Sequence, residues 1–288
     1  MKKLKLLLIL SLMFSLTGCF KKDNFEDANI YVSVYPIEYI VNYLYGNYST
    51  ISSIYPDGVD TDKYKLTNKQ IKDYSETDLY VFNGMSEKEN EYVTSMFKYN
   101  KNLKIIDATQ TMEYTYHENE LWYDPSNFLM LALNVKNGIL EYTTNHTLNK
   151  TIEENYQNLK IEISKIDANL KLLYENSNTK TIVVDSNTYK FLEKYGFTVI
   201  SLEEDESLND KVINDVNDLI DSGEIKYIFS NNKNNLNDTV SKIVKNSNVE
   251  VLEFKNLTNL TDEERSNKED YISLLNDNID LLKNELYK

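Results

Sequence analysis

Among the side chains of this sequence that could bind a ligand or take part in a reaction, the acidic ones are the most numerous. The chain of 288 residues has 46 aspartates and glutamates, but only two histidines, His117 and His146, and one cysteine. Neither histidine belongs to an HExxH motif, and the sequence contains no GxSxG motif and no glycine-rich phosphate-binding loop. Carboxylate oxygens suit hard cations such as Ca²⁺, Mg²⁺ and Mn²⁺, whereas imidazole nitrogens suit Zn²⁺. Because these catalytic motifs are missing, the sequence predicts a protein that is not an enzyme.

The only cysteine, Cys19, follows a segment with the pattern of an export signal. Three lysines lie within the first five residues, residues 6–16 are almost entirely apolar, and Leu16-Thr17-Gly18-Cys19 comes next. This pattern is typical of a secretory signal peptide, and the apolar stretch falls short of the roughly 20 residues that span a bilayer. Since Cys19 has no disulfide partner, we predict that residues 1–18 are removed and that Cys19 carries a palmitate-type lipid anchor. The alternative is a short buried helix with an incidental cysteine.

The charge of the chain limits its possible partners. Removal of residues 1–18 takes away three lysines and no acids, which changes the formal net charge from −15 to −18. Such an acidic surface argues against nucleic acid and anionic lipid headgroups as partners. It fits a protein that handles cations, but an acidic surface that is merely solvated explains the charge equally well.

Strand-like and helical segments alternate twice along the chain. Alternation of this kind is typical of mostly parallel sheets with flanking helices, so we predict two α/β lobes of about four strands each. The predicted strands cover residues 30–35, 50–55, 79–83 and 103–107 in the first lobe, and 181–185, 198–202, 225–230 and 249–254 in the second. After a tether at residues 19–29, the predicted boundaries are 30–144 for the first lobe, 145–178 for a linking helix and 179–288 for the second lobe.

The linking helix has the most regular apolar spacing in the sequence. Its apolar residues recur at intervals of four and three, which places them on one face of an α-helix. They are Ile152, Tyr156, Leu159, Ile163, Ile166, Leu170 and Leu173. We predict a stiff helix packed along both lobes, with little hinge motion; a coiled-coil partner is the alternative. A second helix with the same spacing, from Ile272 to Leu282, is expected to fold back on the second lobe.

Several segments resemble a known protein family. They are Val34-Tyr35-Pro36-Ile37, residues 56–64 (PDGVDTDKY), residues 78–84 (DLYVFNG), Leu121-Trp122-Tyr123-Asp124-Pro125, and residues 260–275, which include LTDEE and YISLL. In order and spacing, from about residue 30 to 285, they are similar to the zinc- and manganese-binding lipoproteins of ABC importers. The resemblance implies two α/β lobes joined by a long helix, with a metal ion held between them.

No histidine stands at the four positions where the resemblance implies metal ligands. The first position falls on Asp62 and the second on Glu120, two residues before the tryptophan. The third falls on Asp185 or Ser186, and the fourth, an acid in relatives, lies near Thr258.

The resemblance therefore implies a metal site made of carboxylates. We predict that Asp62, Glu120 and Asp185 bind a divalent cation, since each follows a predicted strand at the edge where open α/β sheets bind ligands. Possible additional ligands are His117, Ser186 and Thr258. Carboxylates shift the preference from zinc toward harder ions. The alternatives are that these acids are solvated loop residues in a cleft that binds no metal, and that His117 is an exposed loop histidine.

The function implied by the resemblance is transport. We expect an extracytoplasmic monomer, held on the cell membrane by the lipid on Cys19, that captures Zn²⁺, Mn²⁺ or a harder divalent ion as cargo. It would deliver the ion to an ABC permease driven by a separate ATPase subunit, with no role for nucleic acid. The alternative is a non-transport surface lipoprotein, used for adhesion or as a partner scaffold, on the same fold with a decayed metal site.

Overall fold

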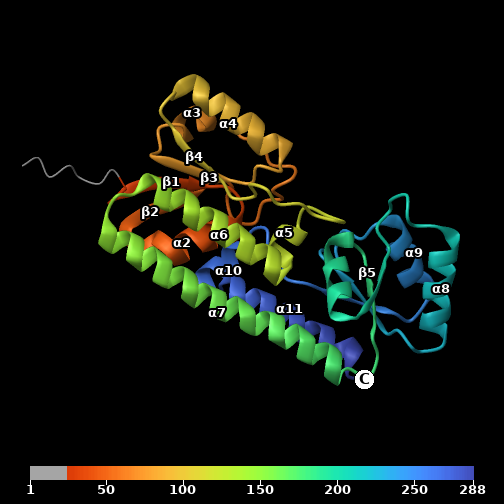
Figure 1. Ribbon diagram of the computed structural model, residues 1–288. Coiled ribbons are helices and arrows are strands. Elements are labelled where there is room, and N and C mark those ends of the chain that lie inside the picture. The colour runs from red at the N-terminus through yellow and green to blue at the C-terminus, as the bar shows by residue number, and fades with distance from the viewer. Residues whose placement is uncertain (1–24) are drawn as a thin grey trace, which may run out of the picture.

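Two parallel sheets form the centres of two lobes (Figure 1). The computed structural model describes residues 25–288, so the predicted signal peptide and Cys19 lie outside the described residues. The first sheet has the order β2-β1-β3-β4 and the second the order β6-β5-β7-β8. All strand pairs are parallel, which confirms the predicted fold class. The strands are β1 (Ala28–Val32), β2 (Ser49–Ser53), β3 (Leu79–Phe82), β4 (Lys104–Asp107), β5 (Thr181–Val184), β6 (Thr198–Ser201), β7 (Tyr227–Ser230) and β8 (Glu250–Glu253).

Helices follow the strands and cover both sheets. In the first lobe they are α2 (Tyr35–Tyr45), the 3₁₀ turn η1 (Gly46–Tyr48), α3 (Asn68–Tyr74), α4 (Glu87–Tyr99), α5 (Glu120–Tyr123) and α6 (Pro125–Tyr142). In the second lobe they are the 3₁₀ helix η2 (Asn187–Tyr195), α8 (Asp210–Asp221) and α9 (Asp238–Asn246). Pro36 and Pro125 lie in the first turns of α2 and α6, where a missing backbone N–H costs nothing. None of the helices in residues 25–288 combines the length and apolarity needed to cross a membrane.

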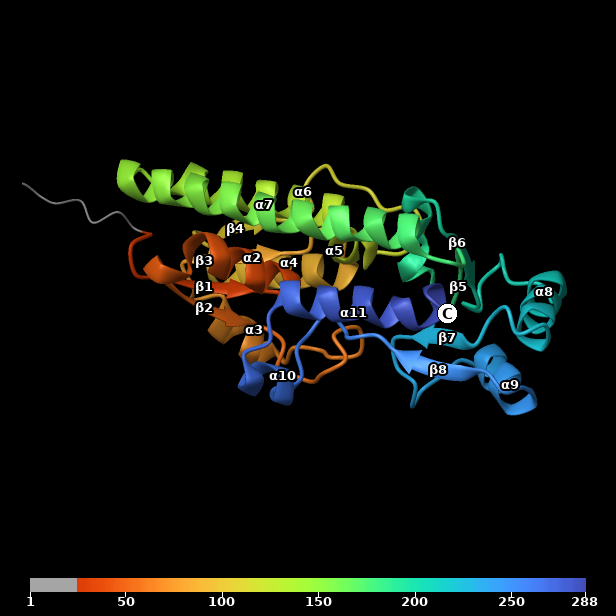
Figure 2. The ribbon, with the colours of Figure 1, turned by 90° about the horizontal axis from the view of Figure 1, so that it is seen from below.

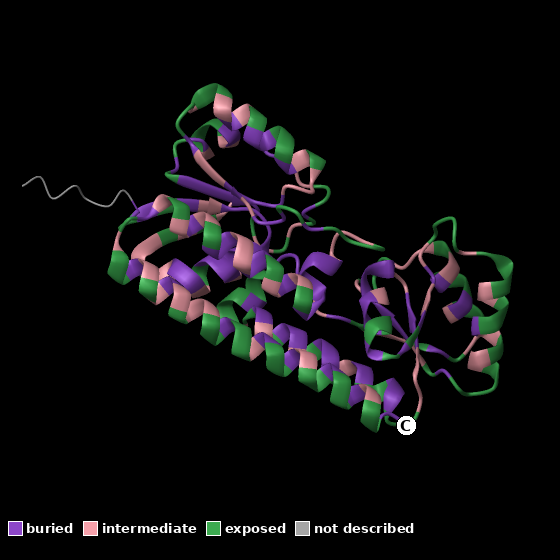
Figure 3. Ribbon diagram, in the orientation of Figure 1, coloured by how far each residue is buried: buried purple, intermediate pink, exposed green. Residues whose placement is uncertain are grey.

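Helix α7 (His146–Asn176) connects the lobes. It has 31 residues, so its length is about 46 Å, and its buried face is the predicted apolar stripe, with Tyr156 half-buried. Asn145 caps its first turn by accepting hydrogen bonds from the backbone N–H groups of Thr147 and Leu148. Figure 2 shows α7 running beside α11 (Tyr271–Leu286) along the first lobe, with both helices ending at the edge of the second. In Figure 3 the buried residues of α7 face the first lobe and α11, and its outer face is exposed.

The C-terminal part of the chain is arranged differently from the prediction. Residues 255–270 leave β8 and return to the first lobe, where α10 (Asp262–Asn267) packs. Helix α11 then runs along α7 instead of folding only on the second lobe, and its Tyr271 stacks on Phe128 of α6 with ring centroids 4.0 Å apart. At the other end, Phe25 is fully buried against Tyr142, so the packed body begins within the segment predicted as a tether.

One apolar core extends through both lobes. It continues from the first sheet along the buried faces of α7 and α11 to one face of the second sheet, including Ile182 and Phe254. A smaller core, with Val183 and Ile228, fills the other face beneath α8 and α9. A continuous core resists movement of one lobe against the other, because opening it would expose apolar surface to water.

We expect the buried stripe of α7 to carry much of the stability of this connection. Leu170 is 1% exposed and Leu172, two residues away on the same helix, is 51% exposed. Leu170→Ala should lower the free energy of unfolding by about 2–5 kcal/mol through lost burial and a cavity, whereas Leu172→Ala should change it by less than about 0.5 kcal/mol. Urea unfolding of the two variants measures the difference, and equal effects would contradict the packing described here.

Candidate metal-binding cavity

A cavity of about 350 Å³ lies at the carboxyl ends of β1 and β3 in the first lobe. The strand order reverses between these two strands, which is the place where open α/β sheets usually bind ligands. Loops after β2, after β3 and before α5 line it, together with Trp122 and Thr258. Asp62, His117 and Glu118 are among the lining residues.

Glu118 and Asp62 bring two carboxylates to this cavity. The side-chain amide of Asn83 donates a hydrogen bond to Glu118, while no hydrogen bond to the Asp62 carboxylate is found within residues 25–288. Burial raises the pKa of Glu118, and the negative charge of Asp62 raises it further, against the opposing effects of the Asn83 bond, His117 and Lys88. The two carboxylates therefore repel each other, and a bound cation would relieve that repulsion.

A third carboxylate, Glu89 of α4, lies at the wall of the cavity. It is 2% exposed, and it accepts hydrogen bonds from the backbone N–H of Asn83 (2.8 Å) and from the hydroxyl of Tyr55 (3.3 Å). Burial raises the pKa of Glu89 to about 7, and the charge of Glu118 adds to the shift. Sequence reasoning missed both Glu89 and Glu118. Glu118 adjoins His117 and Glu89 stands in the first turn after the strand β3, which are the signals that could have found them.

His117 lines the cavity but supports its own loop. Its Nδ1 accepts a hydrogen bond from the backbone N–H of Asn119 at 3.1 Å. A neutral imidazole that accepts at Nδ1 carries its proton on Nε2, so Nε2 is not available as a metal ligand in this arrangement.

Glu120 also supports that loop, and it does not line the cavity. Its carboxylate accepts hydrogen bonds from the backbone N–H groups of Thr115 (3.2 Å), Tyr116 (2.6 Å) and His117 (2.7 Å), and the residue is 5% exposed. A carboxylate with three such donors has little capacity left for an ion. The structure thus places the predicted second ligand inside the turn that presents Glu118.

Asp185 and Ser186 lie in the second lobe, away from the cavity lining. Asp185 accepts a hydrogen bond from the hydroxyl of Ser230, and burial raises the pKa of its carboxyl group. The hydroxyl of Ser186 accepts from the backbone N–H of Thr188 and so caps η2. Thr258 does line the cavity, where its hydroxyl accepts a hydrogen bond from the indole N–H of Trp122 at 3.2 Å.

Aromatic side chains of α5 separate the cavity from Asp185. Trp122 lines the cavity, whereas Tyr123 packs edge-on against Tyr189 of η2 with ring centroids 5.4 Å apart. The hydroxyl of Tyr123 accepts a hydrogen bond from the backbone N–H of Leu257, and the charge of Asp185 acts on this buried phenol, whose pKa burial raises to about 12. The expected groove between the lobes is therefore filled at this point.

The predicted ligand set is only partly brought together. Asp62, His117 and Thr258 line one cavity, while Glu120, Asp185 and Ser186 do not. Within the described part of the chain, no three His, Cys, Asp or Glu side chains are grouped closely enough to hold a metal ion. Two acids, Asp62 and Glu118, are the charged oxygen ligands that the cavity offers most directly.

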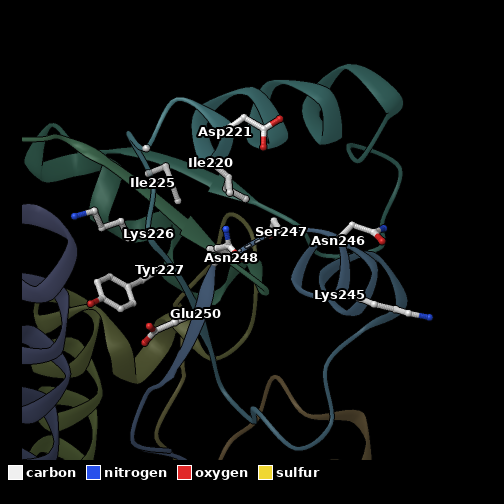
Figure 4. Close-up of a pocket in the computed structure, with 12 residues that line it drawn as sticks. Ile220, Asp221, Ile225, Lys226, Tyr227, Lys245, Asn246, Ser247, Asn248 and Glu250 are labelled. Atoms are coloured by element: carbon white, nitrogen blue, oxygen red, sulfur yellow. Dashed lines mark hydrogen bonds between the residues drawn. The ribbon is translucent and has the colours of Figure 1, made fainter.

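A larger cavity, of about 660 Å³, lies in the second lobe, at the amino-terminal ends of β7 and β8. It is bordered by the starts of β7 and β8 and by the last turns of α8 and α9. Figure 4 shows that its charged side chains, those of Asp221, Lys226, Lys245 and Glu250, do not converge on one point. Helix C-termini and divergent charges provide no concerted ligand set, so we assign no binding role to this cavity.

The family and its structural relatives agree with this fold. The family model described as the periplasmic component A of a zinc-uptake complex matches residues 30–285. The Zn(II)-bound ZnuA-like domain of Streptococcus pneumoniae AdcA is similar, with a TM-score of 0.73, 16% identity and coverage of 91% of this chain and 100% of that domain. The metal-dependent lipoprotein YcdH of Bacillus subtilis has a TM-score of 0.72, 16% identity and coverage of 91% and 100%. An Mn-bound periplasmic protein of Candidatus Liberibacter asiaticus has a TM-score of 0.69, 18% identity and coverage of 90% and 100%.

The chain belongs to the periplasmic zinc-uptake component family. This confirms the resemblance inferred from the sequence motifs, and it places the chain in a family of extracytoplasmic binding components rather than of enzymes. No curated protein sequence matches the chain significantly.

We expect the buried Glu89 to make the stability of the protein depend on pH. Its pKa of about 7 lies above the usual value of 4.5, so between these values the folded state binds more protons than the unfolded state, and stability falls as the pH rises. Glu89→Gln removes this titration. Relative to wild type, its free energy of unfolding should rise by about 2–3 kcal/mol from pH 5 to pH 8.

Urea unfolding at the two pH values measures this difference. Glu91→Gln, at an exposed position on the same helix, is the control and should show no such change. If Glu89→Gln kept a constant offset from wild type, Glu89 would not be the buried acid described here.

Proposed function

We propose that this protein captures a divalent metal ion outside the cytoplasm and delivers it to an ABC permease that works with a separate ATPase. Membership of the uptake-component family supports this role, and so do the Zn(II)-bound and Mn-bound states of its structural relatives. The lipobox-like segment ending at Cys19 supports anchoring of a monomer to the outer face of the cell membrane.

The observation that carries the proposal is the acidic cavity at the reversal point of the first sheet. Asp62 and Glu118 supply carboxylate oxygens there, and water molecules complete the coordination, as they do for many Mg²⁺ and Mn²⁺ sites. With no imidazole nitrogen ready to bind, hard ions such as Mn²⁺, Mg²⁺ and Ca²⁺ gain relative to Zn²⁺.

The proposed ligand pair revises the set derived from the sequence. Asp62 is common to both, and Glu118 takes the place of Glu120, whose oxygens are engaged by three backbone donors. Asp185 is left out because Tyr123 and Tyr189 lie on the side of α5 away from the cavity, where Asp185 is also found. His117 would join only after its proton moved from Nε2 to Nδ1 and the Asn119 bond broke.

A second candidate function is a non-transport surface lipoprotein that keeps the scaffold without its cargo. The lack of a three-residue metal-binding group in residues 25–288 favours it. The two functions differ in one measurable respect, which is whether the metal-free protein binds an ion.

Calorimetric titration of chelator-treated protein with Zn²⁺, Mn²⁺ and Ca²⁺ tests the transport function. We expect binding of at least one ion, with hard ions favoured, and a loss of affinity of about tenfold or more in Asp62→Asn and in Glu118→Gln, since each removes a charged ligand. Glu113→Gln is the matched control, because it removes an exposed acid from the same loop outside the cavity lining.

Asp185→Asn decides between the two ligand sets. Unchanged affinity supports the cavity pair, whereas a loss equal to that of Asp62→Asn would restore the set that spans both lobes. No heat and no thermal shift with any ion would reject metal capture and favour the scaffold.

A further inference from the structure

Lys88 places an ammonium group at the acidic cavity. It is the lysine among the residues that line the cavity in the described part of the chain. Its Nζ donates a hydrogen bond to the backbone carbonyl of Thr61, directly before Asp62, and lies 5.0 Å from the ring centroid of Tyr55. Both contacts stabilise a cation, because a carbonyl oxygen and the face of an aromatic ring carry partial negative charge.

The position of Lys88 on its helix makes these contacts more significant. Lys88 is the second residue of α4, and the first turn of a helix disfavours cations because its free N–H groups carry partial positive charge. The ammonium group therefore depends on partners outside the helix. Its side chain is half-buried, so it is directed along the cavity wall and not extended into solvent.

Three carboxylates line the cavity together with this ammonium group. Lys88 lines the same cavity as Asp62, Glu89 and Glu118, and a positive charge there attracts nearby carboxylates. Asp62 follows the carbonyl that holds the ammonium group. The acids that would attract a metal ion thus share their cavity with a cation that belongs to the chain.

We propose that Lys88 is a built-in counter-ion that competes with the metal ion for the cavity of Asp62 and Glu118. This inference rests on the proposed metal-binding function and adds the residue that limits affinity. A divalent ion has twice the charge of the ammonium group, so it gains more from the same carboxylates. The flexible four-carbon stem of lysine lets the displaced ammonium group move into solvent.

Such a counter-ion has two consequences for the protein. It stabilises the metal-free cavity by reducing repulsion between acids. It also lowers the affinity for every cation, because part of the attraction is spent on displacing the ammonium group. A monovalent ion gains little from this exchange, so Lys88 selects for divalent cargo.

Replacement of Lys88 tests the proposal. Calorimetric titration of metal-free wild type, Lys88→Met and Lys63→Met with Mn²⁺, Ca²⁺ and Zn²⁺ compares two lysines near Asp62. Lys63 is exposed and pairs with Asp60 at 2.7 Å, outside the cavity lining. We expect Lys88→Met to bind on the order of tenfold more tightly than wild type, as for the loss of one nearby unit charge, and Lys63→Met to remain within about twofold.

The outcomes separate this inference from the proposed function. If wild type binds and Lys88→Met binds equally or more weakly, the counter-ion role is overturned and metal capture stands. If only Lys88→Met binds, the counter-ion role stands and metal capture by the natural protein is rejected. If neither binds, both are rejected.

A thermal-unfolding cycle guards against a folding defect. Lys88→Met should lower the melting temperature, and adding Glu118→Gln should restore part of the loss, because the second change removes an acid that has lost its counter-ion. If Lys88→Met does not fold, the titration is repeated with Lys88→Gln. Additive effects of the two substitutions would contradict a charge interaction between Lys88 and the cavity acids.

Discussion

The packing of Trp122 and Tyr123 between the lobes determines where this protein can bind a ligand. Both side chains are 2% exposed, and the segment after β8 holds them through hydrogen bonds from Leu257 to Tyr123 and between Trp122 and Thr258. The hydroxyl of Tyr271 donates to the carbonyl of Trp122. These groups fill space beside η2, and the cavity that Asp62 lines does not include Asp185. The proposed binding site therefore lies in the first lobe, where the neighbouring turn presents Glu118.

The acidic loop that contains Asp62 is held by residues about 200 positions later in the sequence. Arg265, the one arginine of the chain, pairs with Glu38 and with Asp57 at 2.8 Å. The side-chain amide of Asn259 donates to the carbonyls of Pro56 and Val59, and the backbone N–H of Gly58 donates to Leu260. This support matters because Asp62 and Glu118 repel each other. A freely moving loop would separate the two charges, whereas a fixed one keeps the cavity ready for a cation.

The fold was predictable from the sequence because its signals are local. The four-and-three spacing of apolar residues in α7 and the alternation of strands with helices depend on neighbouring residues only. The ligands depend on tertiary contacts. Glu120 has the residue type of a ligand, but its carboxylate accepts three backbone N–H groups of its own turn, and that turn directs Glu118 to the cavity instead. Glu89 looks like a solvated residue in a helical first turn until the Asn83 and Tyr55 contacts bury it. The return of residues 255–270 to the first lobe has no periodic signal at all.

Carboxylates in place of the histidines that the resemblance implies would change more than the preferred ion. A neutral imidazole can wait in an empty site at no electrostatic cost, but a group of carboxylates cannot, because each charge destabilises the others. Such a cavity therefore needs compensation, and two sources of positive charge are present: a proton on Glu89, whose pKa burial raises to about 7, and the ammonium group of Lys88. A metal ion must displace part of this compensation when it binds. Under the proposed function, the net affinity would be the attraction of the acids for the ion less the cost of displacing this compensation.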